Sequence, residues 1–249
     1  CEGDPVSVSG DVFLKYDALT RLLFDYADAH PTLVSVDSIG KSHEGRDIWV
    51  ATVTNTATGV AADKPAFWAD GNIHAAELTA STAVLYFLHQ LCSGYGTPTE
   101  EGRQITQLLD TRTIYLCPRL NPDGAELALA DRPRHIRSST RRYPFDEDPV
   151  EGLTMEDVDG DGRILSMRIP DPHGAYKQRE QDPRLMVARE PGEFGGEYYR
   201  LMPEGTLKNW DGLTVKVNKD VEGLDLNRNF PAFWRQEFEQ VGAGPYPTS

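Results

Sequence analysis

The feature that most constrains the fold is a short apolar strand that leads through a glycine turn into a long helix. Residues 65–70 are predicted to form a buried strand, Gly71 follows as a turn residue, and residues 78–91 have the length and apolar content of a helix. Units of strand, turn and helix build open α/β sheets, which bind ligands at the carboxyl ends of their strands. We therefore expect a binding site in the turn after Gly71.

The N-terminal half continues this alternation of strands and helices. Apolar periodicity predicts further helices and strands, at 15–30 and 101–110 and at 33–40, 47–55 and 113–117 respectively. After the last of these strands, the Asn121-Pro122-Asp123-Gly124 segment indicates a turn. A chain of 249 residues with 39% apolar residues can bury one large core, so we predict a single α/β domain over residues 1–249.

The expected binding turn holds His74 and Glu77. Imidazole and carboxylate groups suit zinc, and catalytic zinc sites often combine two histidines with one glutamate and leave the fourth position to water. Side chains three residues apart share one face of a helical turn, so these two groups can converge on one ion. On spacing alone, a surface histidine beside a helix-start glutamate is the alternative interpretation.

A second polar motif, Asp225-Leu226-Asn227-Arg228-Asn229-Phe230, lies near the end of the chain. The planar guanidinium of Arg228 can donate two parallel hydrogen bonds to a carboxylate, which suits the motif to an anionic substrate. The alternative for any arginine is a solvated surface charge.

With three further motifs, these segments resemble the zinc carboxypeptidase family, the family of carboxypeptidase A. The resemblance implies a mixed central β-sheet flanked by helices, a zinc cofactor, and hydrolysis of the C-terminal bond of peptides or proteins with a free C-terminus. The five motifs that carry it occur in the family's order: Gly40-Lys41-Ser42 with Glu44-Gly45-Arg46, Gly71-Asn72-Ile73-His74-Ala75-Ala76-Glu77, Asn121-Pro122-Asp123-Gly124, Arg134-His135-Ile136-Arg137, and Asp225 to Phe230.

The resemblance also implies a zinc site built from named residues. His74 and Glu77 match two of the family's zinc ligands. Asp225 matches the carboxylate that accepts the other imidazole N–H of His74 and so fixes the tautomer of the ring. Ordinary loop capping is the alternative role for this aspartate.

Three further residues match the family's substrate contacts. Arg137 matches the arginine that polarises the scissile carbonyl and stabilises the oxyanion of the transition state, although an arginine-rich surface is the alternative. Asn227 and Arg228 match the pair that binds the terminal carboxylate of the substrate. Ala76 stands where the family often has arginine, so one auxiliary substrate contact is expected to be missing.

The third zinc ligand and the general base have no match. In the family, a histidine and a glutamate lie well beyond the Asn-Arg motif, whereas this chain has no histidine after His173. We therefore expect the 249 residues to be the N-terminal part of a catalytic domain, truncated at its C-terminus, with both residues beyond Ser249. His89, in a predicted helix, and the other remaining histidines are not expected to replace the ligand.

The segment of about 138–224 is predicted to be a long irregular insertion, because it is rich in glycine, proline and charge where the family's plainer members have a short link. Within it, Asp157, Asp159 and Asp161 alternate as at the start of an EF-hand-type calcium loop, although Arg168 occupies the place of the usual last glutamate. We predict calcium binding by these three carboxylates, with a solvated acidic turn as the alternative.

Two other functions stay open. A zinc amidohydrolase acting on small N-acyl amino acids or on cell-wall peptides would have the same fold. A non-catalytic peptide- or calcium-binding protein that has lost its zinc would keep the same motifs in part.

Composition and charge limit the partners and the location. The 25 basic and 39 acidic residues give a net charge of −14, which argues against nucleic acid. No apolar run approaches the roughly 18–20 residues that span a bilayer. We expect a monomer that is secreted or periplasmic, as mature family members usually are, with Cys1 as a candidate lipid anchor. Cys92 and Cys117 are predicted to be buried apolar residues and not a disulfide.

Overall fold

The chain divides into two compact units, Cys1–Glu147 with Val221–Ser249 and Asp148–Asp220, and each is described by itself. Cys1, the predicted lipid anchor, and Arg134 of the fourth motif lie outside the described residues. The computed structural model describes residues 10–131, 133, 135–141, 152–209, 215, 223–236 and 238–244.

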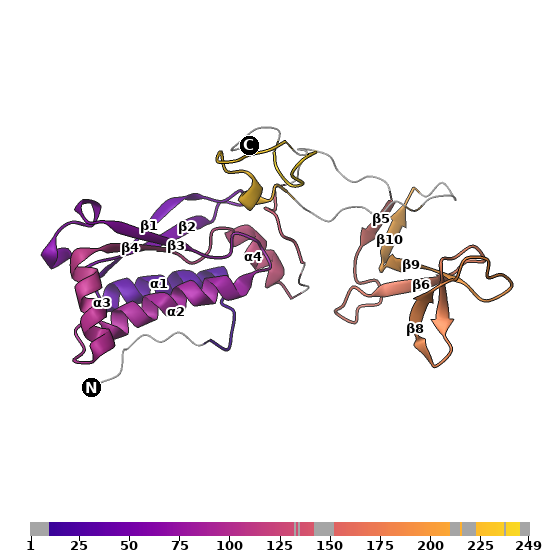
Figure 1. The fold of residues 1–249 in the computed structure, drawn as a ribbon, viewed down its shortest axis with the longest axis horizontal. Coiled ribbons are helices and arrows are strands. Elements are labelled where there is room, and N and C mark those ends of the chain that lie inside the picture. Colours follow the sequence, from indigo (N-terminus) through magenta and orange to yellow (C-terminus); the bar gives the residue numbers. More distant parts are fainter. Residues whose placement is uncertain are drawn as a thin grey trace. The chain divides into compact units, whose positions relative to one another are not determined.

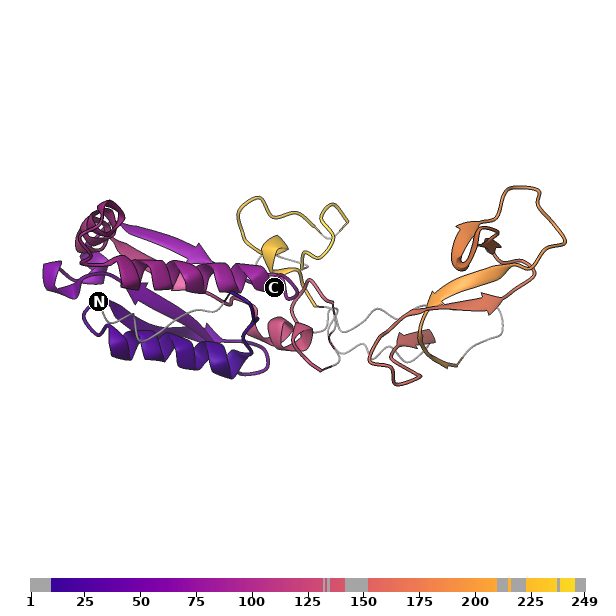
Figure 2. The same ribbon diagram turned by 90° about the horizontal axis from the view of Figure 1, so that it is seen from below.

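The first unit is built on a four-stranded mixed sheet in the order β1-β2-β4-β3. β3 is parallel to β4, whereas β2 is antiparallel to both β1 and β4. Helices α1 and α2 lie against one face of this sheet (Figure 1) and run side by side (Figure 2). The elements in chain order are α1 (Tyr16–Ala29), β1 (Val34–Lys41), β2 (Asp47–Val53), η1 (Thr56–Thr58), η2 (Ala61–Asp63), β3 (Ala66–Asp70), α2 (Leu78–Gly94), α3 (Glu100–Thr111), β4 (Thr113–Cys117), α4 (Pro122–Ala128) and η3 (Leu226–Arg228).

The core lies between these two helices and the sheet. Leu19, Leu23 and Tyr26 form one stripe of α1 at helical spacing, and each is at most 1% exposed. Leu85 and Leu88 of α2 pack into the same cluster. Burying a leucine side chain contributes roughly 1.5–3 kcal/mol, so this cluster is a large part of the driving force for folding. The helices and strands that periodicity predicts in this unit are confirmed.

Two local predictions are corrected by the structure. β3, predicted to be a buried strand, lies at the edge of the described sheet, and its Phe67 and Trp68 are 56% and 45% exposed. The apolar content of β3 led to an overestimate of its burial. In the described sheet, β3 has a neighbouring strand, β4, on one side only, so its other side is left uncovered. The turn predicted after β4 begins helix α4, since the Asn121 side chain accepts the Gly124 N–H and Pro122 occupies the first helical turn.

Gly71 permits the sharp turn between β3 and α2. A Cβ at this position would lie 2.6 Å from the carbonyl oxygen of Ala80 in the first turn of α2. Glycine avoids this collision because it has no Cβ. Asn72 follows in the left-handed region, with φ of 57°. The expected binding residues, His74 to Glu77, therefore lie directly after a tightly constrained turn.

The second unit contains two antiparallel sheets, a two-stranded one of β10-β5 and a four-stranded one in the order β6-β9-β7-β8. The prediction of an irregular segment is thus corrected. Its strands are short and mostly exposed, so apolar alternation does not mark them in the sequence. The single domain over residues 1–249 stays a prediction. The strands are β5 (Gly152–Met155), β6 (Ser166–Pro170), β7 (Tyr176–Arg179), β8 (Asp182–Ala188), β9 (Tyr199–Pro203) and β10 (Gly205–Lys208).

The two described cysteines, Cys92 and Cys117, are buried and form no disulfide, as predicted. Burial raises the pKa of Cys117 to about 12, so its thiol stays protonated and is no nucleophile at neutral pH. Across the described part of the chain, no helix is both long and apolar enough to cross a membrane.

Candidate active site

His74 and Glu77 face each other across the turn between β3 and α2. His74 Nδ1 lies 2.9 Å from Glu77 Oε2. The imidazole is buried, whereas 57% of the Glu77 side chain is exposed. Two ligands of one tetrahedral zinc ion would lie about 3.3 Å apart at the usual zinc–nitrogen and zinc–oxygen distances. The spacing of this pair is therefore close to that of two zinc ligands.

The second nitrogen of the imidazole faces Asp225. His74 Nε2 lies 3.4 Å from Asp225 Oδ1, and this buried nitrogen has no hydrogen-bond partner among the described residues. Asp225 is itself fixed as the N-cap of η3, where its carboxylate accepts the Asn227 N–H at 2.9 Å. A metal on Nδ1 requires the ring proton on Nε2, next to an acceptor. The unpartnered nitrogen and the adjacent carboxylate thus fit a metal-bound histidine.

Arg137 joins the two carboxylates of this cluster. Its Nε donates to Asp225 Oδ2 at 2.7 Å, and its Nη1 donates to Glu77 Oε1 at 3.4 Å. The side chain is 47% exposed, so part of the guanidinium faces solvent. The structure therefore brings together four predicted site residues from three segments of the chain. A potential metal-binding pair lies next to an arginine that can contact an oxyanion.

Backbone hydrogen bonds hold the His74 turn against the Arg137 segment. Ala75 N donates to Arg137 O, and Ala76 N donates to Ile136 O, both at 3.2 Å. These bonds fix how the His74 turn and Arg137 are placed relative to each other. Sequence analysis missed them, because backbone pairing between remote segments outside regular strands leaves no local signal.

Asn227 and Arg228 lie on η3 directly after Asp225. Arg228 Nη1 donates to the Asn227 carbonyl at 3.0 Å, and the Asn227 side chain is exposed. Within the described residues, no hydrogen bond or ion pair joins either side chain to His74 or Glu77. The predicted carboxylate-binding pair is thus adjacent to the converged cluster in sequence, but no such bond among the described residues links it to the His74–Glu77 pair.

The predicted calcium loop has a different set of close carboxylates. Oxygen atoms of Asp157, Asp159 and Glu204 lie within 4.8 Å of one another, and Asp161 is not part of this group. Glu204 is buried, and its carboxylate already accepts three backbone N–H groups. It follows β9, far from the loop in sequence, so no local pattern could have identified it. Calcium binding stays a prediction.

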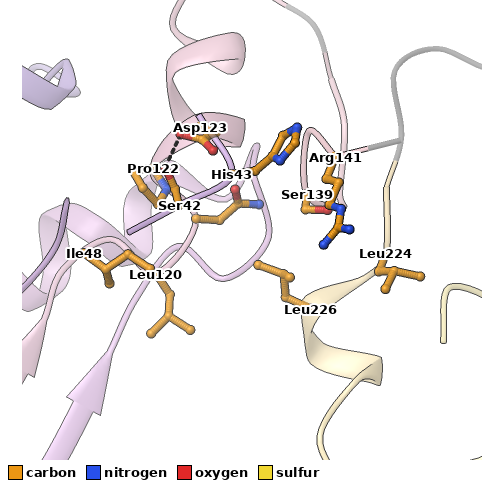
Figure 3. Close-up of a pocket in the computed structure, with 11 residues that line it drawn as sticks. Ser42, His43, Ile48, Leu120, Pro122, Asp123, Ser139, Arg141, Leu224 and Leu226 are labelled. Atoms are coloured by element: carbon orange, nitrogen blue, oxygen red, sulfur yellow. Dashed lines mark hydrogen bonds between the residues drawn. The ribbon is translucent and has the colours of Figure 1, made fainter. Parts of the chain in front are cut away.

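A cavity of about 220 Å³ lies beside the residues that flank Asp225 (Figure 3). Leu224 and Leu226 line it, as do Ser42 and Asp123, whose side chains are joined by a hydrogen bond of 2.7 Å. These lining residues come from the first, third and fifth sequence motifs or lie next to them. Motifs that are separate in the sequence therefore meet in the fold.

The chain belongs to the zinc carboxypeptidase family, because the family model described as "Zinc carboxypeptidase" matches residues 19–160. It is similar to a zinc carboxypeptidase of Saccharothrix mutabilis subsp. capreolus, with 36% identity over 102 residues that cover 41% of this chain and 22% of that protein. It is also similar to carboxypeptidase A2 of Mus musculus, with 40% identity over 95 residues that cover 38% and 21%. The matched segment therefore spans less than a quarter of either relative.

Solved structures of similar proteins include thrombin activatable fibrinolysis inhibitor, with 22% identity and a TM-score of 0.49, and the carboxypeptidase A of Helicoverpa armigera, with 24% identity and a TM-score of 0.47. Each match covers 57% of this chain and 33% of the other. The predicted family and the predicted mixed sheet flanked by helices are both confirmed.

Proposed function

We propose that the complete protein is a zinc-dependent carboxypeptidase that hydrolyses the C-terminal bond of peptides or proteins. Membership of the family supports peptide hydrolysis. The observation that carries the proposal is the convergence of His74, Glu77, Arg137 and Asp225 from three segments of the chain. A pair of groups that can bind a metal, a carboxylate that orients the imidazole and a half-exposed arginine are part of what metal-assisted hydrolysis requires; the third ligand and the general base are expected from the rest of the complete protein.

In this proposal, His74 Nδ1 and the Glu77 carboxylate would supply two of the ligands that hold zinc. When bound, zinc would supply a water molecule of lowered pKa and polarisation of the scissile carbonyl. Asp225 would accept a hydrogen bond from the N–H at His74 Nε2, which would fix the tautomer that leaves the Nδ1 lone pair free. Arg137, anchored to Asp225 through Nε, directs the exposed part of its guanidinium to the carbonyl oxygen as negative charge grows there.

We assign binding of the C-terminal carboxylate of the peptide substrate to Arg228 and Asn227. A guanidinium can donate two parallel hydrogen bonds to a carboxylate, and a C-terminal amide lacks the charge that strengthens them. A free C-terminus is therefore bound in preference to an amidated one.

The test compares two peptides that differ only at the C-terminus. The complete protein should lose activity on chelation, recover it with zinc, and cleave the free peptide faster than the amidated one. Arg228→Ala should lower kcat/KM for the free peptide by about thirty- to a thousandfold, the effect of losing roughly 2–4 kcal/mol of charge-assisted binding.

Arg184→Ala is the matched control, because this arginine is 89% exposed and, among the residues that the structure describes, its side chain pairs only with Asp182 in the second unit. It should leave the ratio of free to amidated cleavage unchanged. Equal cleavage of both peptides by the unmutated protein would contradict the proposal.

The amidohydrolase and pseudoenzyme alternatives gain no support from the relatives reported above, which are named carboxypeptidases. Secretion or periplasmic export, a lipid anchor at Cys1 and the monomeric state stay predictions.

A further inference from the structure

Asn72 is a buried asparagine in an unusual backbone conformation beside the proposed zinc site. It is 2% exposed and has a φ of 57°, a region that favours glycine. Its side-chain Nδ2 donates to the carbonyl of His74 at 2.8 Å and to the carbonyl of Ala75 at 3.1 Å. Glycine would adopt this backbone at lower cost, so the asparagine contributes something that only its side chain supplies.

We propose that Asn72 is a positioning residue that holds the His74–Glu77 turn in the geometry in which both side chains meet. This inference rests on the function proposed above. The His74 carbonyl accepts two donors, Asn72 Nδ2 and the Glu77 N–H at 3.1 Å, so both of its lone pairs are used. The orientation of the peptide group after His74 is thereby fixed, and with it the direction from His74 to Glu77.

Asn121 supports the same turn from helix α4. Its backbone N–H donates to the Asn72 carbonyl at 3.1 Å, and its Nδ2 donates to the Ile73 carbonyl at 3.4 Å and to the Ser138 carbonyl at 3.0 Å. The carbonyls of four consecutive residues, 72 to 75, are thus all bonded by two asparagines. Buried backbone groups outside regular secondary structure need such partners; here side-chain amides serve the carbonyls of residues 73 to 75, and a backbone N–H serves that of Asn72.

The consequence concerns the affinity for metal. Ligands of a metal site must be held within about 0.5 Å of their working positions by surrounding contacts. Loss of a side chain that hydrogen-bonds a metal ligand typically lowers metal affinity about 10- to 100-fold, and we expect an effect of this order for Asn72, which bonds the backbone of the ligand residue. Asn72 does not touch the metal-binding atoms, so its effect reaches them through the backbone of the turn.

Two substitutions separate the side chain from the backbone conformation. Asn72→Gly permits the left-handed backbone but removes both hydrogen bonds, whereas Asn72→Asp keeps the shape but places a carboxylate against two carbonyl oxygens. Asn209→Gly is the matched control, because Asn209 also has a positive φ, 54°, and is exposed in the second unit. All three are measured in the complete protein, with circular dichroism as the check of folding.

Zinc affinity is measured by competition with a chromophoric chelator, and the cobalt-substituted proteins are compared by their visible absorption. Both Asn72 variants should bind zinc about 10- to 100-fold more weakly, with an altered cobalt spectrum, and kcat should fall more than KM for a peptide rises. Asn209→Gly should behave as the unmutated protein.

Unchanged zinc affinity and an unchanged cobalt spectrum in Asn72→Gly would overturn the inference. Loss of folding in Asn72→Gly but not in Asn209→Gly would overturn it too, since the side chain would then serve overall stability. A separate experiment tests the proposed function itself. If His74→Ala in an otherwise unmutated protein binds zinc as well as the unmutated protein does, the proposed zinc site is wrong.

Discussion

Asp123 is a buried carboxylate whose removal should destabilise the first unit. It is 4% exposed and accepts three hydrogen bonds, from Ser42 Oγ at 2.7 Å, from the Glu44 N–H at 2.9 Å and from Arg46 Nη1 at 2.7 Å. These bonds attach the turn between β1 and β2 to the start of α4. Asp123→Ala removes the buried acceptor that all three donors share, although the donors themselves are partly or fully exposed.

The expected size of the effect follows from these contacts. A neutral hydrogen bond contributes about 1 kcal/mol, and one between charged groups contributes more. Arg46 keeps its bond to Glu44 at 2.7 Å and is 29% exposed, so part of the loss at the guanidinium is recovered. We expect the free energy of unfolding to fall by about 3 kcal/mol, which lowers Tm by about 6–12 °C for a unit of this size.

Thermal melts followed by calorimetry and circular dichroism measure this change. Asp47→Ala is the control, because Asp47 lies in the same hairpin and pairs with Lys41 and Ser38, but its side chain is 27% exposed. Exposed ion pairs contribute little, so its shift should be much smaller. If Asp123→Ala lowers Tm no more than Asp47→Ala does, the argument from burial and hydrogen bonding is refuted.

Two further predictions test other parts of the molecule. Arg137→Ala should lower kcat by about 10²- to 10³-fold with a smaller change in KM, because the lost contact strengthens in the transition state; a rise in KM alone would contradict this role. Glu204→Gln should destabilise the second unit at neutral pH but not at low pH. The Leu165 N–H, and then the Val158 N–H, hold the pKa of Glu204 below its ordinary value, so the stabilisation is present above that value and is lost as pH falls through the lowered one. Melts of both proteins between about pH 7 and pH 3 should converge at the acid end, and parallel curves would count against this interpretation.

Hydrophobic periodicity and residue type were sufficient to predict helices α1 to α3 and strands β1 to β4 of the first unit, but not helix α4. Leu19, Leu23 and Tyr26 identify α1 because residues at helical spacing share one face of a helix. This pattern involves only residues that are near one another in the sequence. The predictions that the structure corrects depend on contacts with segments that are distant in the sequence. The exposure of Phe67 depends on where β3 lies in the sheet, and strand order is not written in the strand itself.

For the candidate site, the sequence by itself determined which residues are candidates. His74 and Glu77 are identified by residue type at a local spacing, and Arg137 and Asp225 by the resemblance of their motifs to the zinc carboxypeptidase family. Only the tertiary structure decided that they converge, that Asn72 holds the turn between them, and that a distant Glu204 and not Asp161 completes the acidic group. The physical reason is that a buried carbonyl or carboxylate accepts whichever donor or neighbour the fold brings to it, and many side chains along the chain could have filled each role.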